Sequence, residues 1–266
     1  MKYIQHSLFL TLLFLLTFSS AVEAKNVDSE KFAKYQLIVS AFKCNIASES
    51  IAKTYLYKGA EVGARQANQE MQTALALYEK NFKKLKGSIN TPKIKNLLLF
   101  IDMSYTELND VIKEPYSLDN AQIVLDLVAT ISEGSRHIAE IYKKEIGHND
   151  PVNRAGLIPK VESIAKYYIA YQVGIKDENT KVQMKKAVDF CQRLIKVRVN
   201  YPKNTVKMNQ IINKVDRLWG IVHTFYLDLD EGGLPFIVFK TTSELKDGLR
   251  AYAKEYKKLK QAELSQ

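Results

Sequence analysis

The sequence predicts an all-α fold of two tandem antiparallel four-helix bundles after an N-terminal signal peptide. Three observations support this prediction. Apolar residues recur at the alternating spacings of three and four that mark one face of a helix. Gly (11) and Pro (6) are scarce among 266 residues, which argues against a turn-rich β-sandwich or barrel. The second half of the chain repeats the first, and 46% hydrophobic residues suffice to bury a core.

The first 24 residues have the pattern of a secretory signal peptide. Lys2 gives a positive start, residues 8–18 form an apolar run, and Val22 and Ala24 stand at the −3 and −1 positions of a cleavage site. An uncleaved anchor is the rival interpretation, but the run is shorter than the roughly 20 residues that a membrane span requires. We therefore expect cleavage after Ala24 and a soluble mature chain in the periplasm.

The rest of the chain repeats itself at an offset of 112 to 114 residues. Four blocks return in the same order, and the small changes in offset fall between blocks, where loops can absorb an insertion. The matched residues are Ile51-Ala52-Lys53 with Ile164-Ala165-Lys166, Tyr78 with Phe190, Asp102 and Tyr105 with Asp216 and Trp219, and Gly134 and Arg136 with Gly248 and Arg250. A duplication of one unit explains this order.

Each unit is predicted to hold four helices. Breaker segments at 59–63, 87–92 and 114–115 divide the first unit, and segments at 174–179, 200–203 and 230–235 divide the second. Four helices joined by short loops favour an antiparallel bundle. Residues 147–151 separate the units, so we place the first bundle at 25–147 and the second at 151–266.

Apolar stripes predict which face of each helix is buried, and helix-start signals are expected at Asp28, Asp119, Asp177 and Thr241. Gly134 and Gly248 lie inside the fourth helix of each unit, where glycine costs helix propensity, so a close helix approach is expected at both. The expected core positions are Leu37, Ala41, Cys44, Ser48, Ile51 and Tyr55; Ile94, Leu97, Leu98, Ile101, Tyr105, Leu108 and Ile112; Val124, Val128, Ile131, Ile138 and Tyr142; and Val206, Ile211, Ile212, Val215, Trp219, Val222 and Tyr226.

The formal net charge of +10 is compatible with nucleic acid, an acidic membrane surface or anionic ligands as partners. Lysines are spread along many helix faces instead of forming one block, so a solvated basic surface is favoured. Export argues against nucleic acid as a partner.

Residues 40–56 and the two Ile-Ala-Lys triplets resemble the first helix of a known family. The triplets match the end of that helix, and Asn153-Arg154-Ala155-Gly156 matches its beginning in the second unit. The family is the periplasmic N-terminal domain of type IV pili methyl-accepting chemotaxis transducers, related to the sensor domains of nitrate/nitrite histidine kinases. The resemblance covers roughly 30–146 and 151–262, and it implies a four-helix sensor domain in each half.

The likeness stops at the anion-binding position. Nitrate-binding members of the family use an Arg of the first helix, whereas Asn45 stands there in the first unit and Ile158 or Pro159 in the second. An Arg offers a charged fork to a planar oxyanion, and Asn offers only neutral donors. Nitrate binding is therefore not expected. The family's membrane span, signalling helix and kinase are also not seen, so we expect a released sensor input module.

Repeated polar and aromatic residues are candidates for a ligand site between helices. The favoured alternative is that Tyr105 and Trp219 fill the core while the charged residues pair at its edge. The candidates are Asn45, Ser48, Asp102, Tyr105, Arg136, Asp216, Trp219 and Arg250.

No cofactor, metal or catalytic group is predicted. Glu133, His137 and Glu140 lie on adjacent turns, but the second unit lacks the set, and di-iron bundles need Glu-x-x-His on two helices. No Ser-His-Asp or Cys-His order and no phosphate-binding glycine loop occurs, so an enzyme is not expected.

Two cysteines leave two interpretations open. Cys44 and Cys191 lie in different units, at places that match the neighbourhoods of Leu157 and Glu79. Export would permit a disulfide between them, and a pair of buried thiols is the favoured alternative.

These features predict a periplasmic sensor module that binds a small molecule or ion, an anion among the candidates, and acts with a membrane-bound chemotaxis or two-component partner. A helical scaffold that docks on another protein without a ligand is the alternative. Sensor bundles of this family pair as dimers, and the tandem copy would supply that pairing in one chain. A monomer with a pseudo-two-fold contact is therefore expected.

Overall fold

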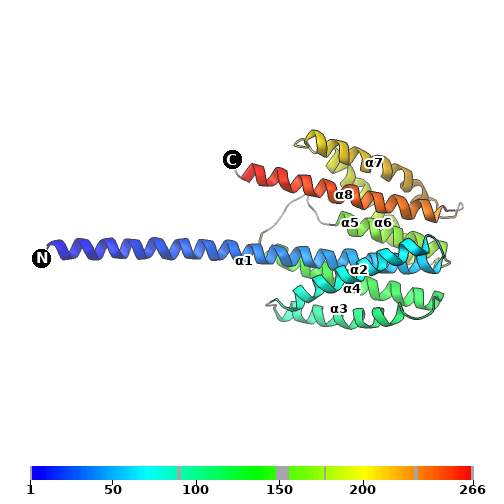
Figure 1. Cartoon of the computed structure of the whole chain (residues 1–266), viewed down its shortest axis with the longest axis horizontal. Helices are drawn as coiled ribbons and strands as arrows, with labels where there is room; N and C mark the ends of the chain where they lie inside the picture. The colour runs from blue at the N-terminus through cyan, green and yellow to red at the C-terminus, as the bar shows by residue number, and fades with distance from the viewer. Residues whose placement is uncertain (1, 89–90, 148–155, 177, 231–232, 265–266) are drawn as a thin grey trace.

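A computed structural model describes residues 2–88, 91–147, 156–176, 178–230 and 233–264, without the side chains of residues 2–28 and 264. The described residues form eight α-helices and no strand, which confirms the all-α prediction (Figure 1). Within this part of the chain no helix has the length and apolar character needed to cross a membrane. The helices are α1 (Lys2–Gly59), α2 (Ala64–Lys86), α3 (Pro92–Val111), α4 (Leu118–Glu145), α5 (Leu157–Gln172), α6 (Glu178–Val199), α7 (Val206–Leu227) and α8 (Pro235–Leu264).

The breaker segments fall between helices as predicted. Of the predicted helix-start residues that the structure describes, only Asp119 lies at the start of a helix. Ser117 caps α4 by accepting from the Asn120 amide, and Asp119 lies in the first turn of that helix. Asp28 lies inside α1 and Thr241 inside α8, so neither begins a helix. The predicted start at Asp177 lies outside the described residues.

Two threonine caps recur at an offset of 114 residues. The Thr91 hydroxyl accepts from the Ile94 amide at 3.4 Å at the start of α3. The Thr205 hydroxyl accepts from the Met208 amide at 3.2 Å at the start of α7. Each cap satisfies one of the amides that the first turn of a helix leaves without a partner.

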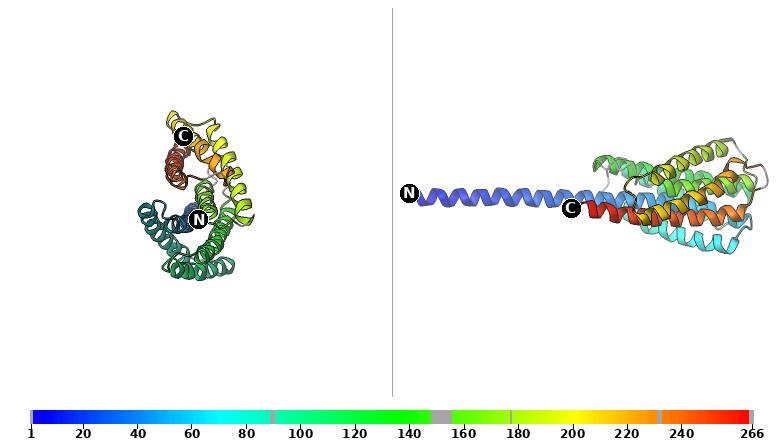
Figure 2. Two further views of the ribbon diagram at one scale, coloured as in Figure 1. Left: turned by 90° about the vertical axis from the view of Figure 1, so that its right-hand side faces the viewer. Right: turned by 90° about the horizontal axis from the view of Figure 1, so that it is seen from above.

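The helix contacts of the first half recur in the second. α1 lies against α2 and α4, and α3 against α4; likewise α5 lies against α6 and α8, and α7 against α8. Successive helices alternate in direction, and this contact pattern is compatible with helical bundles (Figure 1). α1 and α5 run side by side in the same direction and join the halves, which lie to either side of this pair (Figure 2).

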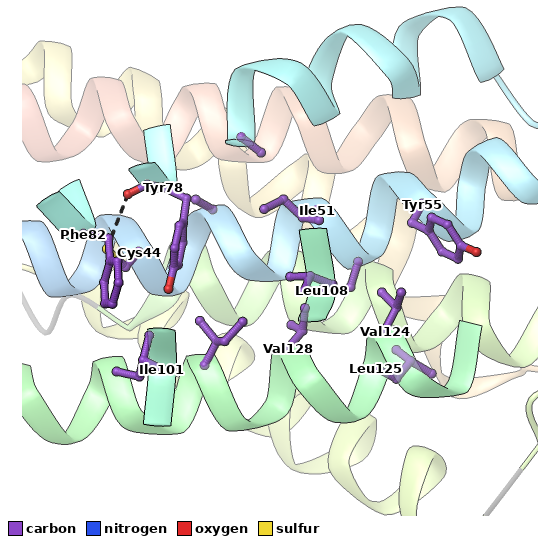
Figure 3. Packing of buried hydrophobic residues seen from close by; sticks show 14 of the residues in the cluster. Cys44, Ile51, Tyr55, Tyr78, Phe82, Ile101, Leu108, Val124, Leu125 and Val128 are labelled. Carbon is purple, nitrogen blue, oxygen red and sulfur yellow. Dashed lines mark hydrogen bonds between the residues drawn. The ribbon is translucent and has the colours of Figure 1, made fainter. Parts of the chain in front are cut away.

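Each half has its own apolar core. The first is drawn in Figure 3, where Ile51 of α1, Leu108 of α3 and Val128 of α4 lie close together. Every predicted stripe position is buried or half-buried except one: Val206, the first residue of α7, is 77% exposed. Much of both cores comes from α2, α5, α6 and α8, for which no stripe was predicted. At one end the halves also share apolar contacts, where the rings of Tyr57 and Phe239 lie 4.7 Å apart.

Each buried position of α2 has a buried counterpart on α6 at an offset of 113, and α6 buries Val188 in addition. This corrects the sequence-based match at one place, because the buried counterpart of Tyr78 is Cys191 and not Phe190, so Cys191 does not match Glu79 either. The pairs are Ala67 with Thr180, Met71 with Met184, Ala74 with Ala187, Tyr78 with Cys191, Asn81 with Leu194, Phe82 with Ile195 and Leu85 with Arg198. Both cysteines are buried and free, as the favoured alternative predicted.

Gly134 of α4 and Gly248 of α8 allow close helix approach, as predicted. A Cβ on Gly134 would lie 2.8 Å from Ile101 Cγ1 of α3, and a Cβ on Gly248 would lie 2.6 Å from Val215 Cγ2 of α7. Ile101 and Val215 are themselves matched residues at an offset of 114. The same tight contact therefore recurs in both halves.

Candidate functional site

The predicted carboxylates of α3 and α7 take part in ion pairs at the rim of each half. Asp102 pairs with Lys86 of α2 at 2.7 Å. Asp216 pairs with Lys196 of α6 at 2.9 Å. Both pairs are partly exposed and lie on separate halves, so the structure does not bring these two candidates together.

The aromatic partners of these carboxylates point inward. Tyr105 stacks on Tyr78 with ring centroids 4.0 Å apart. Trp219 is 2% exposed, and its indole N–H donates to the side chain of Gln192. Both rings therefore fill space between helices of their own half.

The other four candidates lie near the junction of the halves. The Asn45 side-chain amide donates to the Ser132 carbonyl at 2.8 Å, and the Ser48 and Ser132 hydroxyls lie 3.1 Å apart. Arg136 lines the same cavity as Asn45, whereas Arg250 lines a second one. The structure thus groups Asn45, Ser48 and Arg136 and keeps Arg250 apart from them.

A set of four charges, three of them buried, joins the halves and was not singled out from the sequence. This charge cluster consists of Lys53 of α1, Glu70 of α2, Glu162 of α5 and Lys246 of α8. Lys53 Nζ lies 2.8 Å from Glu70 Oε1 and 2.9 Å from Glu162 Oε2. Lys246 Nζ also pairs with both carboxylates. Lys53, Glu162 and Lys246 are all at most 4% exposed, so each charge depends on its neighbours in place of water.

The titration of the charge cluster reflects this mutual dependence. Burial disfavours the charged form of Glu70, but the ammonium groups of Lys53 and Lys246 outweigh it and hold the pKa of Glu70 at about 2. Burial likewise works against the Lys246 ammonium, but Glu162 and Glu70 raise its pKa. Lys53 is fully enclosed and faces Lys246, so burial lowers its pKa despite the two carboxylates. A loss of either carboxylate would therefore leave buried ammonium groups uncompensated.

A related but smaller set lies across the junction. Lys166 Nζ of α5 lies 3.0 Å from Glu49 Oε2 of α1, and the Ser132 hydroxyl donates to Glu49 Oε1 at 2.8 Å. Burial opposes the Lys166 ammonium, but Glu49 raises its pKa above the ordinary value. Glu49 and Lys166 are the counterparts of Glu162 and Lys53 at an offset of 113, so each half provides a Glu to the Lys of the other.

Each buried carboxylate faces a cavity between the halves. The Glu162 cavity, of about 300 Å³, lies among α1, α2, α5 and α8. The Glu49 cavity, of about 350 Å³, lies among α1, α4, α5 and α6. Ten lining residues of one cavity correspond to ten of the other at offsets of 113 or 114: Ile46 with Pro159, Ala47 with Lys160, Glu162 with Glu49, Ser50 with Ser163, Gln66 with Asn179, Glu70 with Gln183, Ser243 with Ala129, Lys246 with Ser132, Asp247 with Glu133, and Arg250 with Arg136.

The two cavities differ in charge at three matched positions, one of which is the exposed Lys160 of the Glu49 cavity, where the Glu162 cavity has Ala47. Where the Glu162 cavity has Glu70 and Lys246, the Glu49 cavity has Gln183 and Ser132. Replacing both members of an ion pair keeps the junction neutral and avoids a buried unpaired charge. The cavities are therefore lined by matched positions of the two halves but differ in their charged residues.

The signal for these buried charges was present in the sequence. Glu49-Ser50-Ile51-Ala52-Lys53 recurs unchanged as residues 162–166, with Glu and Lys four residues apart. Such a pair is typical of a solvated helix face. Its identical return in both halves, between apolar neighbours, was the feature that could have shown burial.

Comparison with protein families, with curated proteins and with solved structures finds no match for this chain.

Proposed function

We propose that this chain is an exported sensor-like module, in which two tandem four-helix bundles bind a small molecule at their junction and act with a membrane-bound signalling partner. The observation that carries this proposal is the pair of related cavities between the halves, each with a buried carboxylate in its wall. Cavities of about 300 Å³ and 350 Å³ lie at the lower end of the range for small-molecule sites.

The reciprocal ion pairs across the junction support a pseudo-two-fold pairing of the halves. Lys53 of the first half pairs with Glu162 of the second, and Lys166 of the second pairs with Glu49 of the first. Two separate sensor bundles would make the same contacts as a dimer. We propose that the duplication supplies this pairing within one chain, so that the protein works as a monomer.

A ligand at this junction would touch both halves at once. A ligand that contacts both halves shifts their arrangement by as much as its affinity differs between the two arrangements. This gives a physical route from binding to a partner that reads the arrangement of the halves. The resemblance to chemotaxis transducer and nitrate/nitrite sensor domains points to a partner of that kind.

Residues 1–24 are proposed to be a signal peptide. The expected mature protein begins at Lys25, which intact-mass measurement of protein isolated from the periplasm checks directly. Ala24→Phe places a bulky residue at the cleavage site and is expected to block processing. A mature chain that retains residues 1–24 in unaltered protein would contradict this part of the proposal.

Thermal shift with a panel of oxyanions, organic acids, amines and amino acids tests the main proposal. A reproducible, saturable shift with one chemical class is expected, and light scattering should give the mass of one mature chain. Silence across the panel, or a tight dimer, would count against the sensor module.

A specific observation favours the second candidate, a protein-docking scaffold. Leu99, Phe100 and Met103 of α3 are each about 60% exposed on neighbouring positions of one helix face. Their counterparts on α7 are polar, namely Asn213, Lys214 and Arg217. Under this proposal Phe100→Lys would abolish crosslinking to a membrane-fraction protein while leaving the thermal stability unchanged.

A further inference from the structure

Besides Lys160, the two related cavities differ in the charged side chains at two matched positions. In the Glu162 cavity, the ammonium of Lys246 lies between the carboxylates of Glu162 and Glu70. In the Glu49 cavity, Ser132 replaces Lys246 and Gln183 replaces Glu70. The Glu49 cavity thus lacks one ammonium and one carboxylate that its counterpart draws from the chain itself.

Among the described residues, the buried carboxylate of Glu49 is the group that lacks a second ammonium partner. It is 6% exposed and lines the cavity, with the Ser132 hydroxyl at 2.8 Å and the Lys166 ammonium at 3.0 Å. Its counterpart Glu162 has two ammonium partners, so Glu49 has one charged partner fewer. A carboxylate in a low-dielectric site binds a second cation more strongly than one in water.

The remaining charges around the Glu49 cavity balance. Besides Glu49, its wall holds the acidic Glu133 and the basic Arg136 and Lys160. Lys166 pairs with Glu49. Arg136 pairs with Glu140 at 3.0 Å and lies 3.7 Å from Glu133. Three acidic and three basic groups favour a ligand that carries both signs over a bare anion or a bare cation. Arg136 and Lys160 are exposed, so they stand at the mouth of the cavity while Glu49 lies at its buried side.

We propose that the Glu49 cavity binds a small zwitterion, with a primary ammonium and a carboxylate as in an α-amino acid. The ligand ammonium takes the place that the Lys246 ammonium holds in the other cavity and pairs with Glu49. The ligand carboxylate faces Arg136 and Lys160. This inference rests on the proposed ligand-binding function and names the ligand class of one of its two cavities.

Size and lining agree with such a ligand. About 350 Å³ equals the liquid volume of roughly a dozen water molecules, enough for a small amino acid. Phe42, Ala129 and Pro159 add apolar wall, which favours an apolar side chain on the ligand. The Glu162 cavity has nearly the same volume, so charge and not space separates the two.

The test uses the mature protein and calorimetry with amino acids, each compared with the matched carboxylic acid that lacks the ammonium and the matched amine that lacks the carboxylate. Binding of one amino acid per chain is expected, at least about tenfold tighter than either matched compound, since each lost charge-assisted contact is worth at least that factor. Arg136→Ala should weaken binding by about tenfold or more. Arg193→Ala, on the exposed face of α6 and outside both cavities, is the matched control and should leave it unchanged.

Two double variants exchange the chemistry of the cavities. Ser132→Lys with Gln183→Glu installs the missing charges in the Glu49 cavity and should abolish binding while circular dichroism shows an intact helical fold. Lys246→Ser with Glu70→Gln removes the corresponding charges from the Glu162 cavity. This double variant should raise the number of amino acids bound per chain from one to two.

The outcomes separate this inference from the proposed function. If oxyanions or plain carboxylic acids bind, lose affinity in Arg136→Ala, and amino acids do not bind, the zwitterion inference is overturned and the sensor module stands. If no compound of any class binds, both fail. Equal binding of an amino acid and its matched carboxylic acid would also overturn the inference, because the ammonium would contribute nothing.

Discussion

Replacing Gly248 with alanine should destabilise the second half through one contact with α7. The added Cβ would lie 2.6 Å from Val215 Cγ2, well inside the contact distance of two carbon atoms. Valine has one strongly preferred χ1 rotamer in a helix, so its methyl cannot turn away and the helices must separate. Overpacking of this kind costs about 1–3 kcal/mol, and the gain in helix propensity offsets about 1 kcal/mol of it.

The matched change in the first half is expected to be milder. A Cβ on Gly134 would lie 2.8 Å from Ile101 Cγ1 and 2.9 Å from Cδ1, so the overlap is smaller than the one at Gly248. We expect a net loss of about 2 kcal/mol in the free energy of unfolding for Gly248→Ala and about 1 kcal/mol for Gly134→Ala.

Gly220 supplies the control within the same fold. It lies inside α7 with no atom within 4 Å of an added Cβ, so Gly220→Ala should stabilise by about 1 kcal/mol through helix propensity alone. Urea unfolding followed by circular dichroism gives all three values. If Gly248→Ala proves as stable as Gly220→Ala, the close approach of α7 and α8 is wrong.

Three further predictions concern protonation, caps and thiols. The charge cluster lowers the pKa of Glu70 from an ordinary 4.5 to about 2, so the stabilisation from Glu70 is complete above pH 4.5 and is lost as the pH falls toward 2. The melting temperature should drop across that window by the equivalent of up to roughly 3 kcal/mol. A melting temperature that does not change with pH would contradict the charge cluster. Thr91→Ala and Thr205→Ala should each lower the free energy of unfolding by about 1 kcal/mol in urea titrations, and no change in either would show that the cap contributes nothing. Burial raises the pKa of both the Cys44 and Cys191 thiols, so a thiol reagent at pH 8 should label neither in the native protein and both in urea, whereas rapid native labelling would refute their burial.

Much of the fold could be predicted because it depends on local pattern. Stripes such as Ile51 with Tyr55 mark the buried face, and the internal glycines Gly134 and Gly248 mark tight contacts through their cost in helix propensity. The errors fall at helix starts. Thr241 has a capping side chain but sits within α8, because the helix already begins at Pro235.

The charge cluster could not be predicted with the same means. Lys53 and Glu70 lie on neighbouring helices of one half, and Glu162 and Lys246 on helices of the other. Spacing along one helix does not tell which of its faces meets the other half, so a buried Lys cannot be told from a solvated one. The candidates Asp102 and Asp216 were chosen by recurrence alone, and recurrence marks shared architecture as readily as a shared site.

The unequal cavities have an evolutionary consequence. In a symmetric homodimer every mutation at the axis is made twice, so exchanging Glu70 and Lys246 for neutral residues would alter both sides together. A tandem copy within one chain has no such constraint, because each position is then inherited singly. Under the proposed function, one side keeps its internal ion pairs while the other binds a ligand, a difference that identical subunits cannot develop.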